Sequence, residues 1–258
     1  MRLMQITLGA VAALALSVSL LAGCGSTAGS AAASSSAAGS TAVSAVSEAA
    51  SSEAADENEA VAAQLMKDLT GSYQELWPVI LADEHTQTWL DDCTALVGED
   101  NAEGAYEKLS SMVTGDVYGE DAVKAYANGG GAYFCGFTQG LATLTFDGEN
   151  SVISGTDKDG STLFSHSYHY IGMEPVRGLY EFKSDDADSG EFTYFFLAPD
   201  TSAETYHIEF RYGSDADALG QYDAGDYAYW LASGISTDCD QTMIDNCIQL
   251  FCTENLDG

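Results

Sequence analysis

The second half of the chain consists of short runs in which apolar and polar residues alternate, with turn residues between the runs. These runs are rich in aromatic and β-branched residues and lie at 133–138, 141–146, 151–154, 161–171, 178–183, 192–197 and 205–212. Side chains of a strand point alternately to the two faces of a sheet, so the pattern predicts strands that bury one face. Strands in this number and at this close spacing predict an antiparallel meander that closes into a barrel.

Helical segments are expected on both sides of these strands. The pattern of apolar residues predicts helical or partly helical elements at residues 59–67, 73–96 and 102–112. A last helix is expected to begin near Thr237 and Asp238, whose side chains accept hydrogen bonds from free helix amides. No repeat and no linker divides residues 61–258, so the sequence predicts one mainly β domain with flanking helices.

The N-terminus resembles a bacterial lipoprotein signal. Arg2 gives a minimal positive region, residues 6–21 are apolar, and Leu21-Ala22-Gly23-Cys24 follows. The apolar stretch is short for a transmembrane helix. The resemblance implies cleavage before Cys24, lipidation of the Cys24 thiol, and a mature chain anchored by lipid to the extracytoplasmic face of the cell membrane. The alternative is an ordinary cleaved signal that happens to precede a cysteine.

A segment rich in Ser, Ala and Gly separates this signal from the folded part. From Gly25 to about Asn58 it has no aromatic residue, and its only bulky aliphatic residues are Val43 and Val46. Such a segment cannot bury enough apolar surface to offset the entropy of ordering, so it is expected to be a flexible linker. We therefore divide the chain into a signal peptide (1–23), a lipid-anchored Ser/Ala-rich linker (24–60) and a folded domain (61–258).

Acidic residues dominate the charge of the chain, with 40 Asp and Glu against 8 Lys and Arg and a formal net charge of -32. Such a surface repels phosphate backbones and anionic lipid heads, so we expect no nucleic-acid partner and no membrane contact beyond the lipid anchor. Part of the acidity is expected to serve solubility. The Asp clusters at 185–188 and 215–217 lie in expected turns and lack the spacing of a calcium-binding hand.

Five cysteines follow Cys24, namely Cys93, Cys135, Cys239, Cys247 and Cys252. Outside the cytoplasm such thiols pair, but an odd number leaves at least one unpaired within the chain. The last three fall on the expected C-terminal helix, where simple packing, or one bond to Cys93 or Cys135, is the expectation. No Cys-x-x-Cys occurs, which argues against a zinc knuckle or a thioredoxin-like redox site.

The run at 205–212 sorts its side chains cleanly between two faces. One face is expected to carry the aromatic and aliphatic residues Tyr206, Ile208, Phe210 and Tyr212, and the other to carry Thr205, His207, Glu209 and Arg211. A histidine and a carboxylate two residues apart on one strand face are able to bind the same metal ion. The alternative is a polar face that simply meets water.

Several segments of the domain, taken in order, have the spacing of a known family. The first is Asp68-Leu69-Thr70-Gly71-Ser72-Tyr73-Gln74-Glu75-Leu76-Trp77-Pro78, and others follow at 176–182, 196–199, 207–215 and 235–236. Together they resemble the ZinT family of extracytoplasmic zinc-binding proteins over most of residues 68–251, with 94–132 similar only as helix. The resemblance implies a calycin-like (lipocalin-like) antiparallel β-barrel, a divalent metal ion as ligand, zinc as cofactor, and a partner such as a metal transporter.

The family holds zinc mainly through three histidines, one just before an aliphatic-aliphatic-Ala-Pro segment and two in a His-x-His pair on the next strand. The resemblance places His207 and Glu209 at the pair and Phe195 at the first histidine. A shifted register would instead place the pair at Thr205 and His207. Because phenylalanine binds no metal, the resemblance implies a weak site of His207 and Glu209, completed by His169 or a local carboxylate.

The other candidate ligands are limited by their positions. His166 and His169 are three residues apart, so on a regular strand they face opposite sides and at most one of them joins the site. His85 follows Asp83 and Glu84 at an expected helix end and is interpreted as an ordinary surface histidine. The remaining carboxylates considered are Glu181, Glu191 and one from the N-terminal part.

Two functions remain open from the sequence. The first is a surface-tethered lipoprotein that binds zinc or a similar divalent metal through a modified ZinT-type site, for metal capture or delivery. The second is a metal-free calycin-like binding module for a small ligand, a protein or a cell-wall partner, in which Phe195 fills the old site. No Ser-His-Asp order, Gly-x-Ser-x-Gly, Cys-His arrangement or phosphate-binding glycine loop occurs, so we expect no enzyme.

Overall fold

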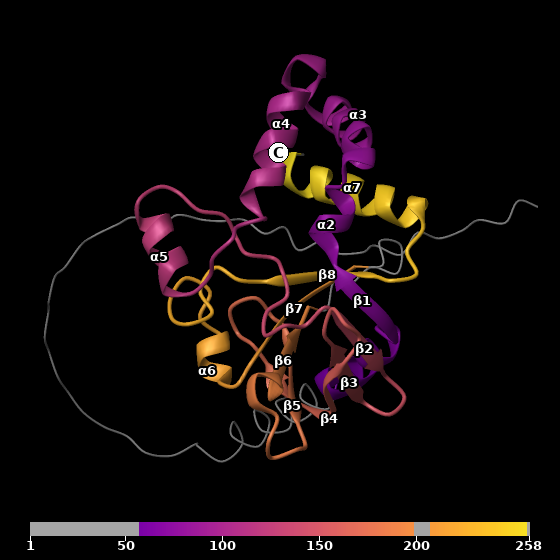
Figure 1. Cartoon of the computed structure of the whole chain (residues 1–258), viewed down its shortest axis with the longest axis vertical. Coiled ribbons are helices and arrows are strands. Elements are labelled where there is room, and N and C mark those ends of the chain that lie inside the picture. The colour runs from indigo at the N-terminus through magenta and orange to yellow at the C-terminus, as the bar shows by residue number, and fades with distance from the viewer. Residues whose placement is uncertain (1–56, 199–206, 257–258) are drawn as a thin grey trace, which may run out of the picture.

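A closed barrel of eight antiparallel strands forms the centre of the computed structural model, which describes residues 57–198 and 207–256 (Figure 1). Each strand pairs with the next one along the chain, and β8 pairs with β1 to close the barrel. The strands are β1 (Gly71–Glu75), β2 (Thr143–Asp147), β3 (Val152–Thr156), β4 (Thr162–Met173), β5 (Tyr180–Ser184), β6 (Tyr194–Leu197), β7 (His207–Gly213) and β8 (Ala232–Ser236). The predicted fold class, a mainly β, calycin-like antiparallel barrel with flanking helices, is confirmed.

Two of these strands are absent from the sequence prediction, and one predicted strand is not part of the barrel. β1 contains Gln74 and Glu75, and β8 is built mostly of small residues, so neither shows a clear alternation of large apolar and polar residues. The predicted strand at 133–138 was wrong. Its residues run alongside the start of β8 without forming a strand, where the carbonyl of Phe134 accepts from the Leu231 amide at 3.0 Å, and Phe137 packs in the barrel cluster.

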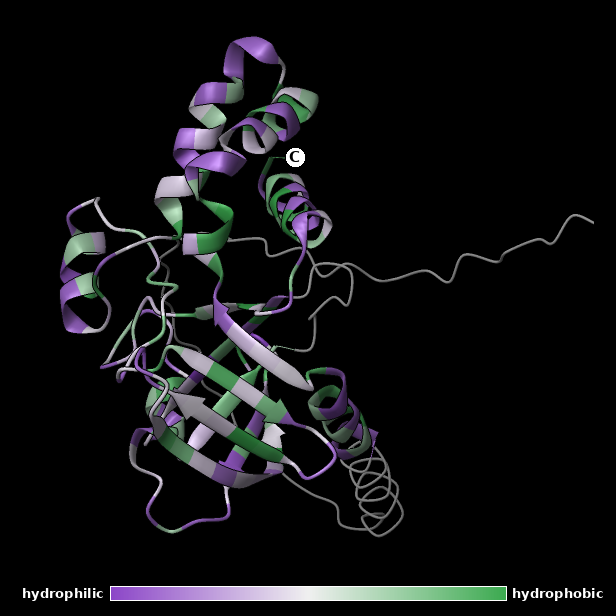
Figure 2. Ribbon diagram, turned by 45° about the vertical axis from the view of Figure 1, so that its right-hand side comes forward, coloured by the Kyte–Doolittle hydropathy of each residue, from purple (hydrophilic) through white to green (hydrophobic). Residues whose placement is uncertain are grey.

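Aromatic rings fill the interior of the barrel. The strands alternate in burial, so that hydrophobic and polar residues alternate along them in Figure 2. The inward residues include Phe146, Phe164, Tyr168, Phe182, Phe195, Phe210 and Tyr212, all less than a tenth exposed. Burial of each such side chain contributes about 1.5–3 kcal/mol, so the interior is the main source of stability. This packing leaves the interior occupied by the protein's own rings.

Helices cover one end of the barrel and form a second hydrophobic cluster, which we call the cap (Figure 1). The cap consists of α2 (Leu76–Ile80), the short 3₁₀ helix η1 (Asp83–His85), α3 (Thr86–Val97), α4 (Glu99–Met112) and α7 (Gln241–Leu256). Its core includes Trp89, whose indole N–H donates to the Ile80 carbonyl at 2.7 Å. Ile235 of β8 also packs in this cluster, which joins the cap to the barrel wall.

The C-terminal helix begins later than the sequence suggests. α7 starts at Gln241, and the carboxylate of Asp240 accepts from the Met243 amide at 3.0 Å. Asp240 therefore caps the helix in place of Thr237 or Asp238. Cys239 consequently lies before the helix, whereas Cys247 and Cys252 lie on it. All five described cysteines are free thiols.

The remaining helices lie beside the barrel. They are α5 (Glu120–Ala127), α6 (Ala216–Leu219), the short 3₁₀ helix η2 (Gly190–Phe192) and the helical residues 57–68. Residues 57–60 are thus helical, although they were assigned to the linker. Of the helices in the described part of the chain, none is long and apolar enough to cross a bilayer. The signal peptide and Cys24 lie outside the described residues.

Candidate functional site

The outer face of β7 carries the two candidate metal ligands that the sequence singled out. His207 and Glu209 are half-buried and face outward, while Ile208, Phe210 and Tyr212 are buried inward, so the predicted alternation is confirmed from His207 onward. Thr205 and Tyr206 lie outside the described residues. On β8, His207 pairs with Ile235, and Glu209 pairs with Ser233. Because neighbours across a ladder share a face, Ser233 and Ile235 flank the two ligands on the outside of the barrel.

Arg211, the third outward residue of this face, does not meet water. It is fully buried and donates hydrogen bonds to the carbonyls of Leu219, Gln221 and Tyr227. Its guanidinium lies 4.4 Å from the centre of the Tyr222 ring. Burial lowers the pKa of Arg211. The interpretation of the whole polar face as solvated is therefore wrong at this end of β7.

Phe195 lies on the opposite side of the barrel wall from His207 and Glu209. On β6 it pairs with the inward residue Tyr212, is fully buried, and lies 5.4 Å from the ring centres of both Tyr168 and Tyr212. The three positions that the resemblance assigns to zinc ligands therefore do not share one face. Successive side chains of a strand point to opposite faces, and His207 and Glu209 are at outward positions of β7 whereas Phe195 is at an inward position of β6.

Each of the two histidines of β4 has its Nδ1 hydrogen-bonded to an aspartate. His169 is exposed, and its Nδ1 lies 2.6 Å from Oδ1 of Asp185. His166 lies between the inward residues Phe164 and Tyr168, and its Nδ1 is 2.7 Å from Oδ2 of Asp186. The two face opposite sides of β4, as their spacing predicts. β4 is also separated from β7 by β5 and β6.

The other predicted metal ligands, and His85, lie elsewhere and contact other groups. His85 is buried against Gln241 and is not a surface residue. Glu191 accepts hydrogen bonds from Tyr227 and Ser214, both at 2.9 Å. On β5, burial raises the pKa of Glu181, and Glu174 and Asp217 add to the shift. Within residues 57–198 and 207–256, no group of three or more His, Cys, Asp or Glu is arranged to hold a metal ion.

Cys135 is a neighbour of Glu209 that sequence reasoning did not place there. The Ser233 amide donates to the Cys135 carbonyl at 3.0 Å, which brings this cysteine beside the β7–β8 pair. Burial, and then the charge of Glu209, raise the pKa of the Cys135 thiol to about 12. The thiol is therefore protonated at neutral pH, and zinc would have to displace that proton in order to bind sulfur.

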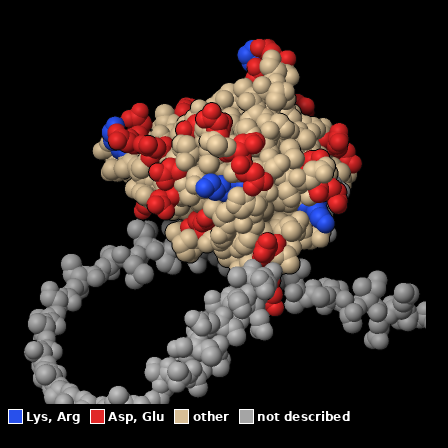
Figure 3. Space-filling model, turned by 90° about the horizontal axis from the view of Figure 1, so that it is seen from below, with Lys and Arg blue, Asp and Glu red and all other residues tan. Residues whose placement is uncertain are grey.

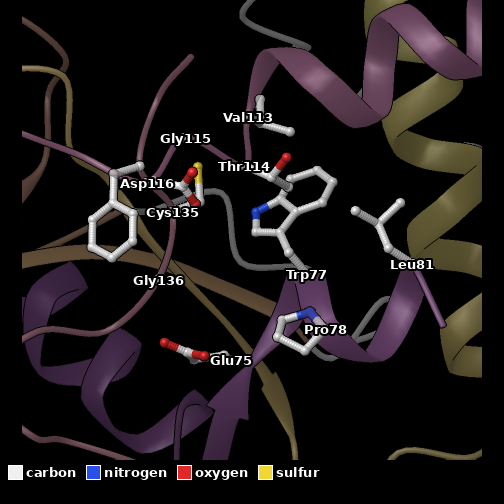
Figure 4. Close-up of a pocket in the computed structure, with 11 residues that line it drawn as sticks. Glu75, Trp77, Pro78, Leu81, Val113, Thr114, Gly115, Asp116, Cys135 and Gly136 are labelled. Carbon is white, nitrogen blue, oxygen red and sulfur yellow. The ribbon is translucent and has the colours of Figure 1, made fainter. Parts of the chain in front are cut away.

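Cys135 also lines a pocket of about 340 Å³ between the barrel and the cap. In Figure 4, the ring nitrogen of Trp77 is on the side of Cys135 and Asp116, with Glu75 below. The Glu75 carboxylate accepts from the Phe137 amide at 2.6 Å, and the Trp77 N–H has no hydrogen-bond partner within the described part of the chain. The walls are Glu75, Trp77, Pro78, Leu81, Val113, Thr114, Gly115, Asp116, Phe134, Cys135 and Gly136.

The pocket has the size range of small-ligand sites, and its ionisable groups are acidic. Its walls come from the end of β1 and α2, the segment after α4, and the segment before β2. These three segments are far apart in sequence, so no local sequence pattern predicts the pocket. The only signal in the sequence is the Glu75 to Pro78 part of the segment that resembles the ZinT family.

Two solved structures from Streptococcus pneumoniae are similar to this chain. One is the Zn(II)-bound ZinT-like domain of AdcA, at 13% identity and a TM-score of 0.44 over 72% of this chain and 88% of that one. The other is Zn(II)-bound AdcA, at 12% identity and a TM-score of 0.41, covering 72% of this chain and 34% of that one. This chain thus spans about a third of the AdcA chain. No family model and no curated protein matches the sequence.

Proposed function

We propose that this chain is a membrane-tethered, extracytoplasmic protein that binds zinc or a similar divalent cation at the outer face of β7, for metal capture or delivery. The observation that carries the proposal is the pair His207 and Glu209, two residues apart on one half-buried strand face. Imidazole nitrogen and carboxylate oxygen are both ordinary zinc ligands. The sequence resemblance to the ZinT family supports the same class of ion, and the lipoprotein-like N-terminus supports the tether.

The site proposed here is weak and open. Two protein ligands leave the remaining coordination positions to water, so we expect a Kd of about 1 μM or higher. His169 takes no part in it, because two strands, β5 and β6, separate β4 from β7. A weak, open site exchanges its ion quickly, which suits transfer to a partner such as a metal transporter.

The second candidate function is a metal-free binding module, and two observations favour it. Phe195 and its neighbours fill the barrel interior with aromatic rings. The pocket of about 340 Å³ between barrel and cap offers a small ligand two carboxylates, Glu75 and Asp116, and the indole of Trp77. Under this alternative, zinc binds no more tightly than it does to any acidic surface.

Chelator competition with the metal-free full chain separates the two functions. We expect one zinc ion per chain, with affinity reduced about tenfold or more in both His207→Ala and Glu209→Gln. The matched control is His169→Ala, which removes an exposed histidine of similar chemistry and leaves zinc affinity unchanged. Binding that is equally weak in all four proteins would contradict the metal function and favour the module.

A further inference from the structure

We propose that Cys93 and Cys252 form a disulfide bond that ties the C-terminal helix α7 to α3 within the cap. Their Sγ atoms lie 3.9 Å apart in the reduced protein, and both side chains are fully buried. Sulfurs in a disulfide are about 2 Å apart, so closure requires an approach of about 2 Å, a distance that side-chain rotation and a small helix shift supply. The proposal does not depend on the metal function.

Aromatic contacts hold the two cysteines in register. Trp89 lies four residues before Cys93, on the same face of α3, and Phe251 is adjacent to Cys252 on α7. The Phe251 ring centre lies 6.0 Å from that of Trp89 and 4.7 Å from that of Trp77. α3 and α7 therefore meet along the turns that carry the two thiols, so the sulfurs face each other whenever the cap is packed.

The structure also indicates which other cysteines stay apart from this bond. Cys247 is five residues before Cys252, so their side chains leave α7 about 140° apart. Cys239 precedes the helix, and Cys135 lies in the pocket wall beside the barrel. Of the pairings that the sequence leaves open, the cap geometry thus points to Cys93 with Cys252.

The oxidation is a thiol–disulfide exchange with a small or protein disulfide as oxidant. The thiolate of one cysteine attacks the oxidant and releases one thiol, and the second cysteine then attacks the mixed disulfide and releases another. The net change converts two cysteine thiols and one oxidant disulfide into the Cys93–Cys252 bond and two oxidant thiols. The extracytoplasmic location expected from the N-terminus places the chain where such oxidants are present.

Burial decides when this exchange takes place. Burial raises the pKa of both thiols, and the charge of Asp92 adds to the shift, so thiolates are scarce in the folded cap. An oxidant also cannot reach side chains that are fully buried. The bond therefore forms while the cap assembles, or after α7 opens locally, and once formed it resists reduction. It joins residues 159 positions apart and so links the start of the domain to its end.

Refolding followed by peptide mapping tests the assignment. The full chain carrying Cys24→Ser, which removes the lipidation thiol, is unfolded, reduced and refolded with oxidised glutathione, and free thiols are then alkylated. We expect one linked pair of peptides, containing Cys93 and Cys252, with Cys135, Cys239 and Cys247 alkylated. Alkylation of both Cys93 and Cys252, or a link from either to another cysteine, overturns the proposal.

Thermal unfolding of the same protein provides a second readout that does not depend on the refolding yield. The chain refolded with oxidised glutathione is expected to show a rise in Tm of several degrees over the same chain refolded with dithiothreitol. Cys247→Ser keeps this rise, whereas Cys252→Ser loses it. An unchanged Tm together with an unlinked Cys93 contradicts the proposal, since a bond across the cap constrains the unfolded chain.

Discussion

Arg211 is fully buried and fixes the segment 219–227 against β7. Its partners among the described residues are the carbonyls of Leu219, Gln221 and Tyr227 and the face of the Tyr222 ring. Carbonyl dipoles and a ring face stabilise a guanidinium that water cannot reach. One side chain thus ties the segment after α6 to β7.

We expect Arg211→Met to lower the free energy of unfolding by about 3 kcal/mol. The substitution keeps most of the side-chain volume but leaves the buried carbonyls without a donor, at a cost of about 1–3 kcal/mol for each group left unpaired. Urea denaturation followed by tryptophan fluorescence measures the change. Lys158→Met is the control, because its exposed pair with Asp159 is expected to contribute less than about 0.5 kcal/mol. A loss no larger than that of the control would contradict the assigned role.

At the scale of elements, the helical residues 57–68 pack directly on the turn between β2 and β3. Leu65 and Met66 are buried in the barrel cluster, and the Gly148 amide donates to the Thr70 hydroxyl at 3.2 Å. A Cβ atom on Gly148 would lie only 2.2 Å from the Met66 carbonyl oxygen and 2.5 Å from the Lys67 Cα. The helix position therefore requires glycine at this turn.

Gly148→Ala is expected to displace the helical residues 57–68 from the barrel, because the clash is with backbone that cannot rotate away. We expect a loss of about 1–3 kcal/mol in unfolding free energy, and faster hydrogen exchange in the 62–69 peptide. Gly172→Ala is the matched control, since a Cβ there has nothing within 4 Å. Equal exchange rates in the two variants would show that the helix is not held by this contact.

At the scale of the whole molecule, acidic side chains are spread over the surface and few cations balance them. Figure 3 shows this for one face, and the chain as a whole has a net charge of -32. Burial and the neighbouring charges of Asp245 and Asp91 raise the pKa of Asp92, whose Oδ2 has no hydrogen-bond partner among the described residues. Glu181 has a raised pKa as well. Such groups bind protons more tightly in the folded state.

We therefore expect the Tm to rise as the pH falls from about 7.5 to about 5. A carboxyl group whose pKa is raised by folding contributes stability below its unfolded pKa, and this contribution is lost as the pH rises through the folded value. Scanning calorimetry across this range measures the trend. The double variant Asp92→Asn and Glu181→Gln is expected to show a weaker dependence of Tm on pH. High salt is expected to reduce the part of this dependence that comes from repulsion between surface carboxylates. A Tm that falls steadily on acidification over this range would contradict the expectation.

Local alternation in the sequence was sufficient to predict much of the barrel and one part of the candidate site. The pattern at 205–212 places His207 and Glu209 on one face because strand geometry alone fixes side-chain parity. The same rule separates His166 from His169. β1 and β8 were not predicted, because their own sequences show little alternation of apolar and polar residues. Pairing with the neighbouring strands holds their small and polar residues in the barrel.

The sequence by itself determined the mainly β class, the acidic character, the lipoprotein-like N-terminus and the outward pair on β7, because each follows from composition or from neighbours along the chain. Tertiary structure decided that Phe195 faces inward, that Arg211 is buried, that Cys93 meets Cys252, and that Glu75, Asp116 and Cys135 share a pocket. Each of these facts depends on contacts between segments distant in sequence, which form only when the barrel closes and the cap packs onto it.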